Sequence, residues 1–268
     1  MRRALDESRR PVALVTGASG GIGRELSMVL AREGYDLVLV ARDGDRLRVL
    51  GDAIARDHGA ASLPVRADLA DPAGPRAVLA AVEAAGLEVD ALVNNAGFAS
   101  YGPFVDADLA TVLDLLQVNV VALTHLTRLV LPGMVARGHG KVLNMASTAA
   151  FVPGPLMAVY YASKAYVLSV SQALAEETRG TGVTVTALCP GLTRTGFQTR
   201  AAMESSGLMR GGLMEPAAVA EAGYRGMARG QAVVIPGVAN RALVQASRLL
   251  PRSLLPRLVQ RVQAPVER

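Results

Sequence analysis

Ser147, Tyr160 and Lys164 are the residues of this chain whose types and spacing best suit chemistry. Tyr160 and Lys164 are four residues apart in a stretch, residues 160–170, that lacks Gly and Pro and favours a helix. Both side chains are therefore expected on one helix face. A phenol has a pKa of about 10, and a cation held beside it favours the phenolate. Ser147 follows an apolar run with strand character, so it can bring a hydroxyl to a tyrosine that acts as general acid and base.

A simpler interpretation of the tyrosine and lysine pair is structural. Such pairs are common on helices, where the ring covers the aliphatic part of the lysine side chain. Tyr161 offers an internal comparison, because the residue four positions after it is Ala165 and no cation accompanies its ring. The pair alone does not decide between catalysis and packing.

A glycine-rich loop near the N-terminus favours catalysis. Residues 12–15 are an all-apolar run, residues 16–23 read Thr-Gly-Ala-Ser-Gly-Gly-Ile-Gly, and a helical stretch follows at residues 24–32. Strand, glycine turn and helix form the arrangement that binds dinucleotide phosphates, because glycine allows close backbone approach and the helix N-terminus offers unpaired amides. The glycine spacing differs from the common G-x-G-x-x-G, so a plain tight turn is the alternative.

With these motifs the chain resembles the classical type of short-chain dehydrogenase/reductase. The resemblance covers residues 10–236 and keeps the family's order of motifs. These are the glycine loop at 16–23, Asn-Asn-Ala-Gly at 94–97, the tetrad Asn119, Ser147, Tyr160 and Lys164, Pro190-Gly191, and Thr195. It implies an oxidoreductase that interconverts a carbonyl and an alcohol with a nicotinamide nucleotide.

The apolar pattern predicts an α/β fold, a single-domain Rossmann-like doubly wound parallel sheet with helices on both faces. Seven short apolar runs alternate with helical patterns, near residues 12–16, 36–41, 62–67, 89–94, 141–146, 183–189 and 232–235. Residues 1–10 are expected to be a flexible lead, residues 11–240 the catalytic domain with a substrate lid at 191–215, and residues 241–268 a basic amphipathic extension.

The resemblance implies a role for each member of the tetrad. Tyr160 would donate the proton during reduction, Ser147 would bond the substrate oxygen, and Lys164 would hold both Tyr160 and the nicotinamide ribose. Asn119 would support a water that relays protons, although by pattern it is equally a helix asparagine with satisfied bonds. The cofactor would contact Gly17, Ser19, Gly21, Ile22, Gly23, Arg42, Asp68, Asn94, Gly97, Tyr160, Lys164, Pro190, Gly191, Thr193 and Thr195.

The end of the second predicted strand favours NADP(H), with NAD(H) as the second choice. NAD enzymes often carry an acidic residue here for the ribose hydroxyls, where this chain has Ala41 followed by Arg42. An arginine can hold the additional 2′-phosphate through charge-assisted hydrogen bonds. Arg24 is a candidate second cation, and the alternative for Arg42 is a solvated loop residue.

The predicted substrate is a lipophilic ketone or aldehyde. Residues 148–157 and 197–214 are rich in Met, Leu and Phe, and methionine adapts to irregular ligands. The alternative is that the lid is apolar because it packs on the body. A non-catalytic nucleotide-sensing or membrane-peripheral binding protein on the same fold is the alternative function, and the complete tetrad argues against it.

Composition bears on whether the protein contains disulfides or metal sites and on whether it is secreted or spans a membrane. The single Cys189 excludes an internal disulfide, and the three histidines show no metal-ligand spacing, so no metal is predicted. Residues 1–10 do not resemble a signal peptide, and residues 109–135 are interpreted as a long buried helix rather than a membrane span, so a cytoplasmic location is expected. A homodimer or homotetramer is the expected assembly.

The basic charge of the chain is concentrated at its C-terminus. Residues 241–268 hold six arginines and one glutamate, a net of +5 that equals the formal charge of the whole chain. The body is therefore near neutral, and no nucleic-acid partner is predicted. An apolar stripe from Leu254 to Val262 lies between these arginines, and Pro251 and Pro256 limit its helix. A cap over the substrate mouth or a subunit contact is favoured over weak membrane-surface contact, because the stripe is short.

Overall fold

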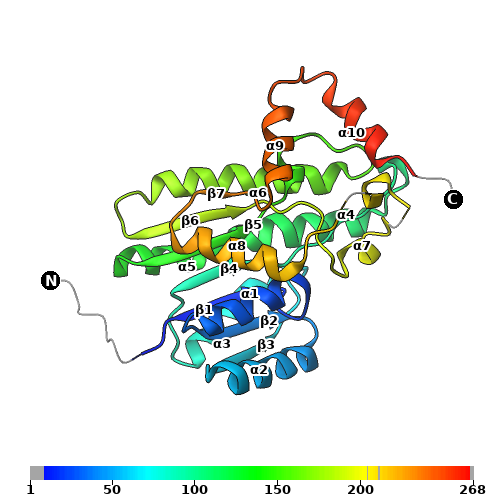
Figure 1. The fold of residues 1–268 in the computed structure, drawn as a ribbon. Helices are drawn as coiled ribbons and strands as arrows, with labels where there is room; N and C mark the ends of the chain where they lie inside the picture. The colour runs from blue at the N-terminus through cyan, green and yellow to red at the C-terminus, as the bar shows by residue number, and fades with distance from the viewer. Residues whose placement is uncertain (1–8, 204, 211, 266–268) are drawn as a thin grey trace.

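A seven-stranded parallel sheet forms the centre of the protein (Figure 1). The computed structural model describes residues 9–203, 205–210 and 212–265. The strands are β1 Val12–Thr16, β2 Asp36–Ala41, β3 Ser62–Arg66, β4 Ala91–Asn94, β5 Gly140–Met145, β6 Val183–Leu188 and β7 Val233–Val234. Their spatial order is β3-β2-β1-β4-β5-β6-β7. The predicted doubly wound α/β fold is confirmed.

Two layers of helices cover the two faces of the sheet. Helices α1 (Gly21–Arg32), α2 (Gly44–His58) and α8 (Pro216–Ala228) pack on one face. Helices α3 (Gly74–Ala84), α5 (Leu123–Arg137) and α6 (Ala158–Glu177) pack on the other. Within β1, Val12 and Leu14 enter the core on one side, while Ala13 and Val15 enter the core on the other. Burial on both faces explains why the strands read as continuous apolar runs.

The remaining helices are short or lie outside the two layers. They are α4 (Leu109–Leu116), α7 (Phe197–Arg200), α9 (Val238–Ser247) and α10 (Leu255–Gln263), with 3₁₀ turns at Phe104–Asp106, Thr148–Phe151 and Gly207–Arg210. Helices α9 and α10 stand above the sheet at the end where α4 and α7 also lie (Figure 1). Helix α9 begins three residues before the predicted start of the C-terminal extension, and residues 266–268 of that extension are outside the described part.

The prediction of a long buried helix at residues 109–135 is only partly right. Helix α4, a six-residue π-helical turn at Gln117–Ala122, and α5 run on continuously. The whole segment is long and apolar enough to span a membrane by length and composition alone. Leu126 and Met134 of α5 lie in the core on the face of the sheet that α3, α5 and α6 cover. The segment is not buried throughout, since Leu109 and Leu113 of α4 are 69% and 55% exposed.

The predicted homodimer or homotetramer stays a prediction.

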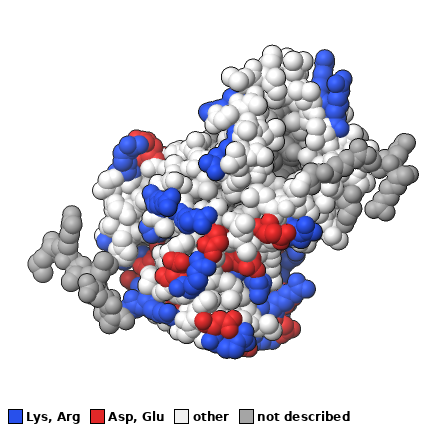
Figure 2. Space-filling model, in the orientation of Figure 1, with Lys and Arg blue, Asp and Glu red and all other residues white. Residues whose placement is uncertain are grey.

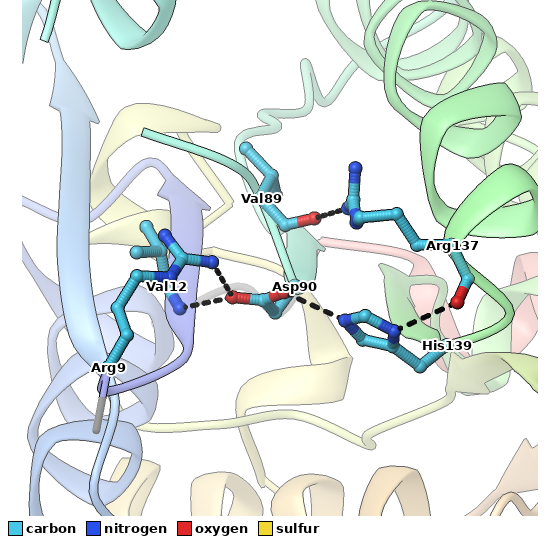
Figure 3. A network of polar contacts seen from close by, with 6 residues as sticks. All are labelled: Arg9, Val12, Val89, Asp90, Arg137 and His139. Carbon is cyan, nitrogen blue, oxygen red and sulfur yellow. Dashed lines mark hydrogen bonds and ion pairs between the residues drawn. The ribbon is translucent and has the colours of Figure 1, made fainter. Parts of the chain in front are cut away.

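A polar network fastens the amino ends of the strands, opposite the end at which α9 and α10 lie (Figure 3). The carboxylate of Asp90, which is 9% exposed, accepts hydrogen bonds from the backbone N–H of Val12 at 2.8 Å and from Arg9 at 3.1 Å. Its other oxygen lies 3.3 Å from Nε2 of His139. The predicted flexible lead is therefore held at Arg9, and residues 1–8 of that lead are outside the described part.

We expect Asp90→Ala to lower the free energy of unfolding by about 3 kcal/mol, because it leaves a buried backbone N–H and an arginine unpaired. The matched control is Asp45→Ala, which removes an aspartate whose side chain is 84% exposed and paired with Arg48. The control should change stability by less than about 1 kcal/mol. Urea unfolding of both variants measures the difference, and equal losses would contradict a special role for Asp90.

Candidate active site

One cavity of about 800 Å³ opens at the carboxyl ends of the central strands. The chain passes from β3 to β4 across the sheet, so β1 lies between β2 and β4 and the loops after β1 and β4 diverge there, as ligand clefts of such sheets require. Most of the predicted site residues line this cavity. They are Gly17, Ser19, Gly21, Ile22, Arg42, Asp68, Gly97, Ser147, Tyr160, Lys164, Pro190, Gly191, Thr193 and Thr195.

The structure brings Ser147, Tyr160 and Lys164 together. Ser147 directly follows the residue after β5, and its hydroxyl accepts a hydrogen bond from the N–H of Ala149 at 3.1 Å. Tyr160 and Lys164 lie one turn apart on α6, as predicted, and the Nζ atom of Lys164 is 5.7 Å from the centre of the Tyr160 ring. Nζ also donates to the carbonyl of Met145, the last residue of β5, at 2.7 Å. The lysine therefore ties α6 to the strand that ends before Ser147.

The predicted lowering of the tyrosine pKa is wrong. Burial raises the pKa of Tyr160 above its ordinary value, and the hydrogen bond with the Ser147 hydroxyl opposes this with a smaller effect. Burial also lowers the pKa of Lys164 to about 8. Tyr160 is consequently a neutral phenol near pH 7, which is the form that can donate a proton.

Asn119 acts from behind the cavity wall. It is fully buried, its amide nitrogen donates to the carbonyl of Phe98 at 3.0 Å and to Ser163 at 3.1 Å, and its oxygen accepts from the N–H of Phe98. A Cβ atom at Gly97 would lie 3.0 Å from the Asn119 amide oxygen and 3.4 Å from Nζ of Lys164. Asn119 thus positions the loop after β4 beside the lysine, and its water relay stays a prediction.

Asn94, which was predicted to contact the cofactor, does not line the cavity. Asn94 is 3% exposed, and its amide nitrogen donates to Thr127 and Asn144 inside the protein. Its neighbour Asn95, the first residue after β4, lines the cavity instead. The sequence showed that one of two adjacent asparagines could meet the cleft. The end of β4 in the folded sheet decides that it is Asn95.

The glycine loop forms an open cradle for a phosphate group. Gly17 and Gly21 have φ values of +67° and +54°, in the left-handed region that favours glycine. A Cβ atom at Gly20 would meet nothing within 4 Å, whereas one at Gly23 would lie 2.3 Å from the carbonyl oxygen of Gly17. Gly23 does not line the cavity, and its role is the close packing of α1 against the loop. The arrangement fits the pyrophosphate of a nicotinamide nucleotide at the start of α1.

Arg42 and Arg46 bring two cations to the end of β2. Both line the cavity, and Asp43 between them caps α2 by accepting from the N–H of Arg46 at 3.0 Å. Arg24, the predicted second cation, does not line the cavity and pairs with Glu25. Arg46 was not among the residues predicted from sequence, because its approach to the cavity depends on how α2 leaves β2.

The other half of the cavity is apolar. Its wall includes Ala149, Met157, Tyr161, Leu192, Phe197, Met203 and Leu208, with Arg200 as the charged residue among the lid residues that line it. Helix α10 lies on this lid, because Val259 packs into the apolar cluster that Met203 and Leu208 share. Helix α10 therefore packs beside the apolar half of the cavity, and the expected cap over a substrate mouth or subunit contact stays a prediction. Glu204 and Gly211 of the lid lie outside the described residues.

Comparison with known proteins identifies the family. The sequence profile described as short chain dehydrogenase matches residues 11–205. A very-long-chain 3-oxoacyl-CoA reductase from Pyrenophora tritici-repentis is 38% identical over 65% of this chain and 52% of its own length. This chain spans between 52% and 62% of the length of such curated relatives. The chain belongs to the short-chain dehydrogenase/reductase family of oxidoreductases.

Solved structures of the family have the same fold. A short-chain dehydrogenase from Sphingobium yanoikuyae in complex with NADPH is 36% identical, with a TM-score of 0.79 over 89% of this chain and 94% of that chain. The bulky-bulky ketone specific alcohol dehydrogenase from Comamonas testosteroni is 29% identical, with a TM-score of 0.76 over 89% and 92% of the two chains. These matches extend over α/β elements beyond the residues of the family profile.

We expect Lys164→Met to stabilise the protein by about 1–2 kcal/mol at pH 7, because a pKa lowered to about 8 means that folding penalises the buried ammonium by about 3 kcal/mol, partly offset by its hydrogen bond to Met145. The lysine is charged in both states at pH 7, so the penalty is complete there. It fades as pH rises from about 8 toward 10.5, the pKa of the unfolded state, so the stability advantage of Lys164→Met should shrink over this range.

Urea unfolding of wild type and Lys164→Met at several pH values measures this change. The matched control is Lys141→Met at the only other lysine of the chain, which is partly exposed on β5. The control should show no comparable dependence on pH. A Lys164→Met protein that is less stable than wild type at pH 7 would show that the ammonium is not penalised by burial.

Proposed function

We propose that the protein is an NADP(H)-dependent oxidoreductase that interconverts a lipophilic ketone or aldehyde and its alcohol. The observation that carries the proposal is the placement of Ser147, Tyr160 and Lys164 at the junction of two different cavity halves. One half offers a glycine cradle and two arginines, and the other is apolar. A neutral phenol at that junction suits a carbonyl oxygen that must gain a proton.

A bound nicotinamide nucleotide supplies the hydride that the carbonyl carbon accepts. In the reductive direction Tyr160 donates its proton to the carbonyl oxygen, which becomes the hydroxyl of the product. Ser147 donates a hydrogen bond to the same oxygen and stabilises the charge that develops on it. Lys164 stabilises the tyrosinate left behind and would hold the nicotinamide ribose. Solvent then returns a proton to Tyr160, and the oxidative direction reverses each transfer.

The apolar half of the cavity supports a lipophilic substrate. Met157, Phe197 and Met203 are flexible or aromatic and offer few hydrogen-bonding groups to a polyol. The names of two similar proteins also point to large carbonyl substrates. One is a very-long-chain 3-oxoacyl-CoA reductase, and the other is an alcohol dehydrogenase specific for bulky-bulky ketones. A panel of ketones and aldehydes that differ in their acyl or alkyl groups tests this part of the proposal.

In that panel, purified protein with NADPH should reduce ketones and aldehydes with kcat/KM rising as the apolar part lengthens, and should be poor with sugars. Tyr160→Phe should lower kcat by about 10²–10⁴-fold, because it removes the proton donor but leaves the nucleotide half intact. Tyr161→Phe is the matched control. Its ring also lines the cavity, yet its hydroxyl has no lysine beside it, and it should lose less than about tenfold.

Similar activity in both tyrosine variants would contradict the role of Tyr160. A wild-type protein that binds NADPH but turns over no member of the panel would support the non-catalytic nucleotide-sensing alternative. Fluorescence titration with NADPH separates loss of binding from loss of turnover in each variant.

The preference for NADP(H) is expected to depend on Arg42 and Arg46. Replacing either by Ala should lower kcat/KM for NADPH about 10- to 100-fold and leave NADH nearly unchanged, since each charge-assisted bond to the 2′-phosphate contributes about 1.5–3 kcal/mol. Ala41→Asp combined with Arg42→Ala should move the preference toward NADH. Arg24→Ala is the control, because Arg24 lies outside the cavity wall. Equal efficiency of wild type with both nucleotides would sink this assignment.

A further inference from the structure

The outer face of the C-terminal helices is apolar and uncovered within the described residues. Leu254, the residue that caps the start of α10, is 44% exposed, and Leu258 and Val262 of α10 are 42% and 54% exposed. They are four residues apart and so share one side of the helix. Leu243 of α9 and Leu249 after it are 65% and 87% exposed. Large aliphatic side chains in such number on one lobe are typical of a surface that contacts another molecule.

The inner face of α10 is held on the substrate lid. Leu255 is 8% exposed and Gln263 is fully buried, while Val259 packs into the lid cluster. The carbonyl of Ala264 accepts from the N–H of Gly207 at 3.1 Å, and Ser206 donates to the carbonyl of Gln263 at 3.2 Å. Whatever binds the outer face of α10 is therefore one helix away from the lid that lines the apolar cavity.

The charges around this apolar surface have one sign. Residues 241–265 contain five arginines, Arg241, Arg248, Arg252, Arg257 and Arg261, and no Asp or Glu. All five are exposed, and none forms an ion pair with another described residue. Figure 2 shows the result: the lobe over α9 and α10 is white with blue at its edges, and the red atoms lie elsewhere in this view.

We propose that this α9–α10 surface docks on an anionic phospholipid bilayer and places the substrate lid at the membrane. Exposed aliphatic side chains flanked by arginines match a helix lying in the interfacial layer, with the apolar side among acyl chains and the cations at phosphate groups. A second copy of the chain fits less well, because a symmetric contact would bring five more arginines against these five. The entry of a lipophilic carbonyl compound from the bilayer is the part that rests on the proposed function.

The test is flotation of the full chain with vesicles of phosphatidylcholine alone or mixed equally with phosphatidylglycerol. We expect binding to the anionic vesicles only, and its loss in concentrated salt. Two triple variants, Leu254→Ser with Leu258→Ser and Val262→Ser, and Arg252→Glu with Arg257→Glu and Arg261→Glu, should each weaken binding at least tenfold.

Two matched variants control for overall charge and overall hydrophobicity. Charge reversal of Arg76, Arg128 and Arg229 changes the net charge equally at exposed positions elsewhere. Serine at Val49, Phe104 and Val105 removes apolar side chains that are 70%, 66% and 88% exposed. Both controls should bind within about twofold of wild type. Equal loss in the controls, or no binding by wild type, would overturn the proposal.

Activity measurements keep the docking surface separate from the proposed function. With a short, water-soluble ketone, the α10 variants should match wild type, while with a long-chain ketone dissolved in anionic vesicles they should be slower. Vesicle binding without any carbonyl turnover leaves the docking surface standing and contradicts the proposed chemistry. Wild type that forms an oligomer broken by Leu258→Ser, and that ignores vesicles, would assign the surface to a second copy and overturn the lipid proposal.

Discussion

The clamp between the ends of β1 and β4 is the contact on which the site depends. The hydroxyl of Thr16 accepts hydrogen bonds from the N–H groups of Asn95 and Ala96, each at 3.0 Å. The Asn95 side chain donates in return to the carbonyl of Thr16 at 2.9 Å and to that of Gly17 at 3.3 Å. These bonds hold the glycine loop against the loop that continues through Gly97 toward the lysine. These hydrogen bonds therefore fix the two halves of the cavity relative to each other.

The catalytic end of this connection contains a charge that folding disfavours. Lys164 is 4% exposed, and the hydrogen bond recorded for its ammonium is to a neutral carbonyl. A buried ammonium with a neutral partner is less stable than one in water. The surrounding core, with strands buried on both faces, supplies the stability that tolerates it. The same burial keeps Tyr160 protonated, so one environment sets the charge of both groups.

Much of the fold and part of the site could be predicted from sequence because they depend on local pattern. The seven apolar runs and the helix that carries Tyr160 and Lys164 are of this kind. That Asn95 rather than Asn94 lines the cavity could not be predicted, since it depends on where β4 ends in the assembled sheet. Arg46 was missed because its approach to the cavity depends on how α2 leaves β2. The direction of the tyrosine pKa depends on burial, which is a property of the assembled fold.

The π-helical turn at Gln117–Ala122 has a consequence for how the long segment between β4 and β5 can vary. Such a turn holds about one residue more than an α-helical turn, so it shifts the rotational phase of α4 relative to α5 by about 100°. With this shift, Asn119 faces Phe98 while Leu126 and Met134 still face the sheet. A chain shortened by one residue here could keep either set of contacts but not both. The position of Asn119 near Lys164 thus depends on one extra residue in this turn, which is the contribution of a single codon.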